Sequence, residues 1–338
     1  MLLHSEIWPI GLLPNDQGQQ PQKPPTRQRT KEPQLRLENP LEVTTNNSKR
    51  LVLVSGRAHK ELALEVAEIL GTTVLPTTAY DFANGETFVR YEESVRGVDA
   101  FVIQAHPAPI NHWIMEQLLM VDALKRASAK RITVVAPFFP YARQDKKHKG
   151  REPISARLMT DLFKAAGANR LMSVDLHTPQ IQGFFDGPVD HLWALPMLAD
   201  HVKERFGHEA ITVVSPDSGR VRVADIWADR LGAPLAIIHK RRDPDRPNQV
   251  EAHELVGDVA GRTCLLVDDM IDTAGTIVAA AQALKANGAA RVIVAATHAV
   301  FSAPAVERLS SGAVDEVIVT NTLPITPDKQ FDNLTVLS

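Results

Sequence analysis

The stretch Thr263–Thr276, T-C-L-L-V-D-D-M-I-D-T-A-G-T, determines how the rest of the chain is interpreted. It begins with a continuous apolar run, Cys264–Val267, which is typical of a strand that a parallel sheet buries on both faces. Asp268 and Asp269 follow at once, and a short loop then leads into a predicted helix over residues 277–286. Open α/β sheets bind their ligands at the carboxyl ends of such strands, so we expect a binding site here.

The loop between this strand and helix has the chemistry of a phosphate site. Its residues are Asp272, Thr273, Ala274, Gly275 and Thr276. Free backbone N–H groups and the helix dipole favour an anion, the hydroxyls add donors, and the small residues allow close approach. The alternative is an ordinary strand-to-helix turn with a threonine cap. Three acids within five residues make that alternative the less favoured one.

Outward from this stretch, strands and helices alternate along the chain from Lys49 onward. Apolar runs predict strands over residues 51–55, 73–76, 100–104, 132–137, 171–176, 211–215, 235–239, 291–296 and 316–321. Helical spacing predicts helices over residues 59–70, 110–128, 154–166 and 221–231. Such alternation predicts an α/β fold with parallel sheets flanked by helices. We expect two tandem domains of similar architecture, residues 48–194 and 195–338.

Composition limits the classes of function. The 338 residues are 44% hydrophobic and 23% charged, as in a soluble globular protein, and no run is long enough to cross a membrane. A net charge of −3 gives no electrostatic reason to expect a nucleic-acid or membrane partner. The one cysteine, Cys264, excludes an internal disulfide and is consistent with a cytoplasmic location.

The first 47 residues differ from the remainder. They contain seven of the 23 prolines and show neither helical nor strand periodicity. We therefore expect a disordered Pro/Gln-rich extension. Its apolar residues are too interrupted to form the core of a signal peptide.

Polar side chains follow several of the predicted strands. A cationic segment, Y-A-R-Q-D-K-K-H-K, ends at Lys149, and S-V-D-L-H places His177 just past a strand end. In the second half, S-P-D-S-G-R supplies Asp217 and H-K-R-R-D supplies Lys240 and Arg242. Acids and imidazole could hold a hydrated Mg²⁺, and the cations could stabilise a phosphoryl group in transit. A solvated loop and a structural histidine are the alternatives for the first two segments.

The quoted motifs resemble those of a known family. V-D-D-M-I-D-T-A-G-T is similar to the phosphoribosyl-diphosphate motif that type I phosphoribosyltransferases and ribose-phosphate pyrophosphokinases share. With F-A-N-G-E, Y-A-R-Q-D-K-K, D-L-H-T-P-Q-I-Q-G, P-D-S-G and H-K-R-R, the chain resembles the ribose-phosphate pyrophosphokinases over almost all of Lys49–Ser338. The resemblance implies two phosphoribosyltransferase-like domains and Mg²⁺ as cofactor. It also implies conversion of ATP and ribose 5-phosphate into 5-phosphoribosyl 1-diphosphate and AMP.

The resemblance also implies roles for individual residues. ATP would be bound by Phe82, Asn84, Gly85, Glu86, Arg143 and Gln144. Ribose 5-phosphate would be bound by Arg242, Asp268, Asp269, Asp272, Thr273, Ala274, Gly275 and Thr276. His177 and Asp217 would be metal ligands, and Lys240 and Arg242 would be catalytic. Two adjacent acids would face the ribose hydroxyls, and the loop 272–276 would hold the 5-phosphate.

Regulation and assembly are implied in the same way. Ser94, Arg96 and Arg151 match positions of a site for the effectors phosphate and ADP. Members are usually hexamers built from dimers, with ATP sites shared between subunits. The sequence departs from the family at Arg220, where many relatives have a second glycine, and at its end, F-D-N-L-T-V-L-S, where the family continues into a helix and a serine-containing tail. We expect a weaker effector response without that tail.

The predicted mechanism is a direct transfer in which the ribose 1-hydroxyl attacks the β-phosphorus of ATP and AMP leaves. Two alternatives remain. A type I phosphoribosyltransferase would share the opening motif but would need neither the cationic segment nor Asp217 and Lys240. A catalytically weak regulatory subunit would be expected to have lost parts of the site, and every strand-end group is present here.

Overall fold

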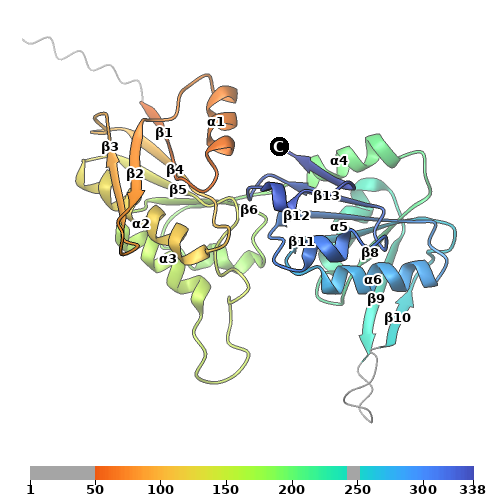
Figure 1. Ribbon diagram of the computed structural model, residues 1–338. Helices are drawn as coiled ribbons and strands as arrows, with labels where there is room; N and C mark the ends of the chain where they lie inside the picture. Colours follow the sequence, from red (N-terminus) through yellow and green to blue (C-terminus); the bar gives the residue numbers. More distant parts are fainter. Residues whose placement is uncertain (1–49, 242–251) are drawn as a thin grey trace, which may run out of the picture. The chain divides into compact units, whose positions relative to one another are not determined.

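The computed structural model describes residues 50–241 and 252–338, and the predicted extension over residues 1–47 lies outside them. One sheet has the strand order β1-β4-β5-β6-β7 with every neighbouring pair parallel (Figure 1). Its strands are β1 (Leu51–Ser55), β4 (Asp99–Ile103), β5 (Arg131–Val135), β6 (Arg170–Val174) and β7 (Val189–Leu192). The same part of the chain contains helices α1 (Lys60–Ile69), α2 (Ile110–Arg126) and α3 (Ser155–Ala166), the 3-10 helix η1 (Pro179–Gly183) and a hairpin of β2 (Thr77–Asp81) and β3 (Thr87–Tyr91).

The second sheet has the order β10-β9-β8-β11-β12-β13-β14, and its pairs are parallel except β10 with β9. Its strands are β8 (Ile211–Ser215), β9 (Leu235–Arg241), β10 (Ala252–Val256), β11 (Thr263–Ile271), β12 (Arg291–Ala299), β13 (Glu316–Thr320) and β14 (Leu334–Leu337). The helices are α4 (Leu195–Phe206), α5 (Val221–Leu231), α6 (Gly275–Ala286), α7 (Ala305–Leu309) and the 3-10 helix η2 (Pro327–Lys329). Parallel sheets flanked by helices confirm the predicted fold class.

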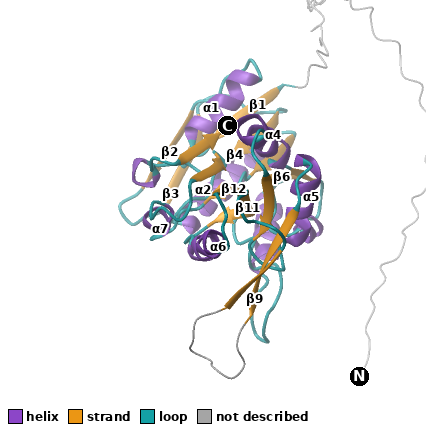
Figure 2. Ribbon diagram, turned by 90° about the vertical axis from the view of Figure 1, so that its right-hand side faces the viewer, coloured by secondary structure: helices purple, strands orange, loops and turns teal. Residues whose placement is uncertain are grey.

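Strand β11 is buried on both faces, as its apolar run predicted. Leu265 and Val267 pack in one cluster with residues of α4 and α5, whereas Cys264 and Leu266 pack in another with residues of α6. Figure 2 shows α5 and α6 on opposite sides of β11 and β12. Because successive side chains of a strand point to opposite faces, a continuous apolar run is required here.

Several predicted strand ends differ from the structure by one to three residues, and two predictions differ more. Residues 73–76 do not form a strand: Val74 makes only an isolated bridge to Leu53, and β2 begins after Pro76, at Thr77. The second error concerns β11, which continues to Ile271 and stays paired with β12 there. Asp268 and Asp269 therefore lie within the last residues of β11 rather than in a loop after it. This part of β11 extends beyond β8, because β8 pairs with β11 only as far as Leu266.

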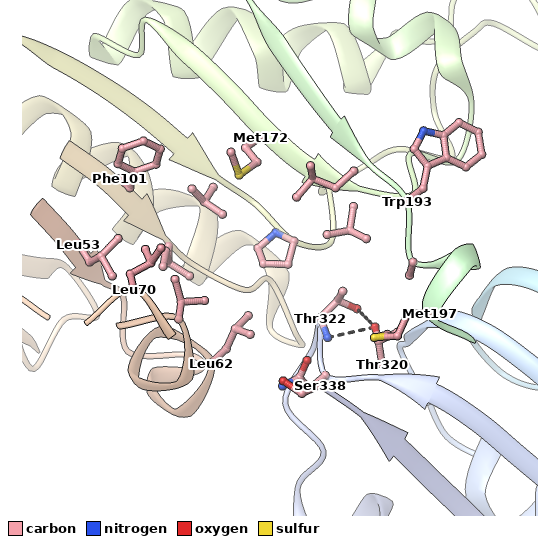
Figure 3. Close-up of a pocket in the computed structure, with 18 of the residues that line it drawn as sticks. Leu53, Leu62, Leu70, Phe101, Met172, Trp193, Met197, Thr320, Thr322 and Ser338 are labelled. Carbon is pink, nitrogen blue, oxygen red and sulfur yellow. Dashed lines mark hydrogen bonds between the residues drawn. The ribbon is translucent and has the colours of Figure 1, made fainter. Parts of the chain in front are cut away.

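One large apolar cavity lies away from the predicted chemistry. Figure 3 shows Leu53, Phe101 and Met172 from the first sheet, Leu62 and Leu70 around α1, and Trp193 and Met197 around a cavity of about 430 Å³. Its wall, as far as the structure describes it, contains none of the predicted site residues. Cavity volume therefore does not identify the functional site, so the site has to be located from its polar groups.

The unit Ser48–Ser338 is compact as a whole, so the boundary at residue 194 stays a prediction. Along the chain, β7 is the last strand of the first sheet and β8 is the first strand of the second. Within the described residues, none of the helices combines the length and the apolar character that a membrane crossing needs.

Candidate active site

The candidate site is centred on the overhanging end of β11. Asp217 follows β8, Lys240 lies in β9, and Asp268 and Asp269 lie in β11, and these three strands are neighbours in the second sheet. The predicted histidine, His177, comes from the first sheet, three residues beyond the end of β6. The structure brings it to the acids: His177 Nδ1 donates to Asp269 Oδ2 at 2.7 Å.

Arg220 is the cation nearest to both acids. Its Nε lies 3.0 Å from Asp268 Oδ1, and its Nη2 donates to Asp269 Oδ1 at 2.5 Å. The same Nη2 lies 2.9 Å from His177 Nδ1. One guanidinium thus contacts all three groups, and its side chain is only 17% exposed.

The two acids have opposite pKa shifts. Burial raises the pKa of Asp268 well above its ordinary value, and the charge of Asp269 raises it further. Burial also raises the pKa of Asp269, but the hydrogen bond from His177 and the charge of Arg220 outweigh this and lower it to about 2. The pair therefore keeps its negative charge mainly on Asp269, which contacts both Arg220 and His177.

A second network fixes the segment that carries His177. Asp175 has a left-handed backbone with φ of 36°. Its Oδ2 accepts from Ala194 N at 3.1 Å and from Thr297 Oγ1 at 2.5 Å, and its carbonyl accepts from His298 Nε2 at 3.1 Å. These bonds join the end of β6 to the end of β12, so they determine where His177 lies relative to β11.

Asp217 is held in a different way. Its Oδ1 accepts from the backbone N–H groups of Gly219 at 2.7 Å and Arg220 at 3.1 Å, at the start of α5. Among the described residues, no hydrogen bond or ion pair joins Asp217 to His177. Nor does the described part of the chain hold a cluster of three or more His, Cys, Asp or Glu side chains arranged as metal ligands. The two predicted metal ligands are therefore not assembled into a closed protein cage.

The predicted 5-phosphate loop leads directly into α6. Ala274 is the N-cap residue with a left-handed φ of 58°, and the helix begins at Gly275. Arg308 of α7 donates through Nη1 to the carbonyl of Thr273 at 2.8 Å, which places a guanidinium beside the loop. A helix N-terminus with an adjacent arginine is a suitable anion site. Sequence reasoning missed Arg308, since nothing in its local sequence marks it.

The predicted nucleotide residues of the cationic segment lie next to this loop. Arg143 Nη1 donates to Asp272 Oδ2 at 2.6 Å, and both line a cavity of about 300 Å³ together with His106. The side chain of Gln144 accepts from Ser155 Oγ at 2.6 Å, at the start of α3.

The cationic segment is also tied to the histidine segment. Asp145 Oδ2 accepts from Thr178 Oγ1 at 2.7 Å and from Gln180 Nε2 at 2.8 Å. The segment is therefore anchored at its first residues, while Lys146, Lys147 and Lys149 are exposed.

The predicted adenine-contacting residues form the tip of the β2–β3 hairpin. Gly85 N donates to Phe82 O, Phe82 N donates to Glu86 O, and Asn84 Oδ1 accepts from Glu86 N. Gly85 has a φ of 88°, which glycine adopts without strain. Phe82 is 47% exposed and contacts Tyr80 and Phe88 by its ring. The tip is a well-formed turn that presents an aromatic side chain to solvent.

The remaining predicted residues are less fully described. The backbone of Lys240 is in register with that of His253 in the β9–β10 pair, and Arg242 lies outside the described residues. Ser94 and Arg96 line one pocket of about 380 Å³ formed by β3, the turn that follows it and the end of α2, whereas Arg151, with a φ of 70°, does not line it. The structure thus brings together two of the three predicted regulatory residues.

Comparisons with known proteins agree with these motifs. A model of the N-terminal domain of ribose phosphate pyrophosphokinase matches residues 51–167, and a model of the phosphoribosyl synthetase-associated domain matches residues 246–333. The chain is 65% identical over 296 residues to the ribose-phosphate pyrophosphokinase of Streptomyces coelicolor, which covers 88% of this chain and 91% of that protein. It is 63% identical over 295 residues to the one from Mycobacterium tuberculosis, covering 87% and 90%.

A solved structure is also similar. The crystal structure of phosphoribosylpyrophosphate synthetase from Mycobacterium smegmatis matches with a TM-score of 0.82 and 62% identity, over 86% of this chain and 94% of that one. With this coverage, the similarity extends over both sheets.

Proposed function

The chain belongs to the ribose-phosphate pyrophosphokinase family, and from this premise we propose how its residues divide the work of the reaction. The reaction transfers the β,γ-diphosphoryl group of ATP to the 1-hydroxyl of ribose 5-phosphate and gives 5-phosphoribosyl 1-diphosphate and AMP. The observation that carries the function is the 65% identity over 296 residues, which includes both halves of the chain. A single-domain phosphoribosyltransferase does not account for it.

Ribose 5-phosphate occupies the end of β11 and the start of α6. The backbone N–H groups of residues 273–276, the two threonine hydroxyls and the N-terminus of α6 hold the 5-phosphate. Asp268 and Asp269 face the ribose hydroxyls. Fixing the sugar by its phosphate delivers the 1-hydroxyl to the reacting phosphorus, which replaces a diffusional encounter by a positioned one.

ATP occupies the neighbouring cavity and the cationic segment. Arg143 and Gln144 bind the nucleotide, and the exposed lysines that follow them close over the phosphates and exclude water. Phe82, Asn84 and Glu86 contact adenine. Because Phe82 is solvent-exposed at a hairpin tip, we place it in the ATP site of a second copy of the chain, within a hexamer built from dimers.

Mg²⁺ is the proposed cofactor, and the residues present fit it. Mg²⁺ prefers oxygen ligands and is usually held by one or two carboxylates together with substrate phosphates. The described acids offer such oxygens without a closed cage, as expected for a cation that arrives with ATP. When bound, it supplies positive charge to the transferred phosphoryl oxygens. His177 and Asp217 are its proposed ligands.

Lys240 and Arg242 are the proposed catalytic residues. Lys240 lies in β9, next to β8 and one strand away from the acids of β11. Cations at this edge neutralise charge that grows on the transferred group and on the departing AMP. Arg242 also binds the sugar phosphate. We assign no general base.

Regulation and location complete the proposal. Ser94 and Arg96, with Arg151, bind the effectors phosphate and ADP, since arginine forks suit phosphate oxygens. The single buried cysteine is consistent with a reducing cytoplasm.

One assay tests the proposed function directly. AMP should form from ATP only when ribose 5-phosphate and Mg²⁺ are both present, with 5-phosphoribosyl 1-diphosphate in equal amount. AMP without the sugar would indicate a hydrolase. No AMP under any condition would indicate the regulatory subunit that the sequence left as an alternative.

A further inference from the structure

Arg220 lies directly against the acid pair Asp268–Asp269. Its guanidinium spans two different carboxylates, at 3.0 Å from Asp268 Oδ1 and 2.5 Å from Asp269 Oδ1. Its Nη1 also donates to the carbonyl of His177 at 3.4 Å. An arginine that serves only as a surface counter-ion pairs with one carboxylate and remains largely exposed, whereas this one is 17% exposed and makes contact on three sides.

The backbone of Arg220 is fixed independently of this contact. It is the N-cap residue of α5, and its N–H donates to Asp217 Oδ1 at 3.1 Å. The side chain therefore extends from a fixed point toward β11. A cavity of about 90 Å³ remains beside it, lined by His177, Asp268 and Asp269 among others. Any ligand that contacts both acids has to displace the guanidinium.

The charge of Arg220 matters because the acids are buried. Two neighbouring carboxylates in a low-dielectric site repel each other, and Arg220 compensates the charge that stays on Asp269. The guanidinium and a divalent cation would compete for the same oxygens, because both are attracted by the same charge and cannot occupy the same volume.

We propose that Arg220 is an internal counter-cation that closes the Asp268–Asp269 pair in the free protein and competes with divalent cations for it. The inference rests on the proposed function, which assigns this pair to the substrate-filled site. The consequence is selectivity between a free cation and a substrate-bound one. A cation that binds without substrate does not gain enough binding energy to displace Arg220. The site therefore remains closed until sugar, nucleotide and cation are bound together.

Direct cation binding to the substrate-free full chain tests the proposal. Mn²⁺ is the probe, and its binding is followed by the relaxation rate of water protons. Arg220→Gln should lower the Kd for Mn²⁺ by about tenfold, the size expected when one opposing charge is removed from a partly buried site. Arg222→Gln is the matched control, because Arg222 is exposed on the same helix, and it should change the Kd less than about twofold.

Thermal unfolding supplies a second readout. Arg220→Gln leaves the acids uncompensated, so its Tm should fall, and Mn²⁺ should restore it more than it raises the Tm of the wild type. A purely structural arginine would lower the Tm without strengthening Mn²⁺ binding. Arg220→Lys keeps the charge but cannot span both carboxylates, and it should lower the Kd by about threefold. If Arg220→Gln does not fold, the lysine variant decides the question, and an unchanged Kd would overturn the proposal.

The Asp269→Asn variant shows whether the acid pair binds a cation at all. If Asp269→Asn weakens Mn²⁺ binding while Arg220→Gln leaves it unchanged, Arg220 is not a competitor and the inference is wrong. If neither variant changes Mn²⁺ binding, the acid pair is not a cation site and the inference is also wrong. The proposed function, which places the acids against the ribose hydroxyls and Mg²⁺ on His177 and Asp217, is tested separately by the AMP assay. Stronger binding by Arg220→Gln that Asp269→Asn abolishes would support the inference.

Discussion

Arg143 Nη1 donates to Asp272 Oδ2 at 2.6 Å, which joins the segment after β5 to the segment after β11. The first residue was predicted to bind ATP and the second to help hold the sugar 5-phosphate. Burial raises the pKa of Asp272, but hydrogen bonds with Ser302 and Arg143 and the charge of Arg143 outweigh it, so the net shift is downward. The carboxylate therefore stays charged, and the two substrate segments are linked in the free protein.

This link predicts that damage to one residue affects the binding of both substrates. Arg143→Gln should raise the KM for ATP and also the KM for ribose 5-phosphate, because Asp272 loses its partner. Stability should change by less than about 1 kcal/mol, since the Arg143 side chain is 55% exposed. Steady-state kinetics and thermal unfolding check both statements.

A double-mutant cycle with Asp272→Asn provides the control for the link. The two substitutions should be non-additive in the KM for ribose 5-phosphate, as expected for residues in direct contact. The exposed helical pair Arg157–Asp161 is a comparison pair, and Arg157→Gln should leave both KM values unchanged. Additive effects of Arg143→Gln and Asp272→Asn would mean that the link has no role in binding.

Thr276→Val tests the phosphate loop with almost no change in side-chain shape. Loss of a hydroxyl that bonds a charged phosphate should raise the KM for ribose 5-phosphate by roughly 10- to 100-fold, corresponding to about 1.5–3 kcal/mol. The KM for ATP should remain within about twofold. Comparable increases for both substrates would show that the loop has collapsed rather than lost one contact.

Lys240→Ala tests the catalytic assignment. Removing a positioned charge from a water-excluded site typically lowers kcat by about 100-fold or more, while substrate affinity changes far less. Rapid-quench measurement of a single turnover separates chemistry from product release. A normal single-turnover rate with weakened ribose 5-phosphate binding would reassign Lys240 to substrate binding.

The buried His106 predicts how stability depends on pH. Burial lowers the pKa of its imidazole to about 4, so the folded protein keeps it neutral where the unfolded chain protonates it. Its contribution is fully present above about pH 6.5 and is lost as the pH falls from there toward 4, by roughly 3 kcal/mol in total. His106→Gln should flatten this part of the stability profile. His208→Gln, at an exposed histidine, should leave the profile unchanged. An unchanged profile in His106→Gln would assign the acid sensitivity to other groups.

Much of the fold could be predicted because each sheet repeats one simple pattern. The strand over residues 51–55, the strand over residues 211–215 and the helix over residues 221–231 were predicted with the boundaries that the structure has. The end of β11 could not be predicted, because Asp268 and Asp269 suggest a loop by residue type. Pairing with β12 overrides this preference and extends the strand to Ile271.

The candidate site was predictable as a set of residue types but not as a set of contacts. Strand-end acids and cations are visible in sequence, whereas the approach of His177 to Asp269 depends on how two sheets meet. Arg220 was noticed only as a departure from a pattern. Its contact with both acids depends on the direction of α5, which no local sequence signal encodes.

The carboxylate and the backbone of Asp175 contribute separately to the position of His177, so two substitutions at this residue can distinguish the contributions. Its Oδ2 accepts two hydrogen bonds, from Ala194 and Thr297, and its φ of 36° lies in the region that asparagine and glycine tolerate. Asp175→Asn keeps the backbone preference but loses the charge, so it should cost about 1–2 kcal/mol of stability. Asp175→Gly relaxes the backbone but removes the acceptor entirely and should cost more. If these bonds position His177, kcat should fall in the same order, aspartate above asparagine above glycine, while the KM for ATP stays within about threefold. Stability losses in that order with an unchanged kcat would show that Asp175 stabilises the junction of β6 and β12 without positioning His177.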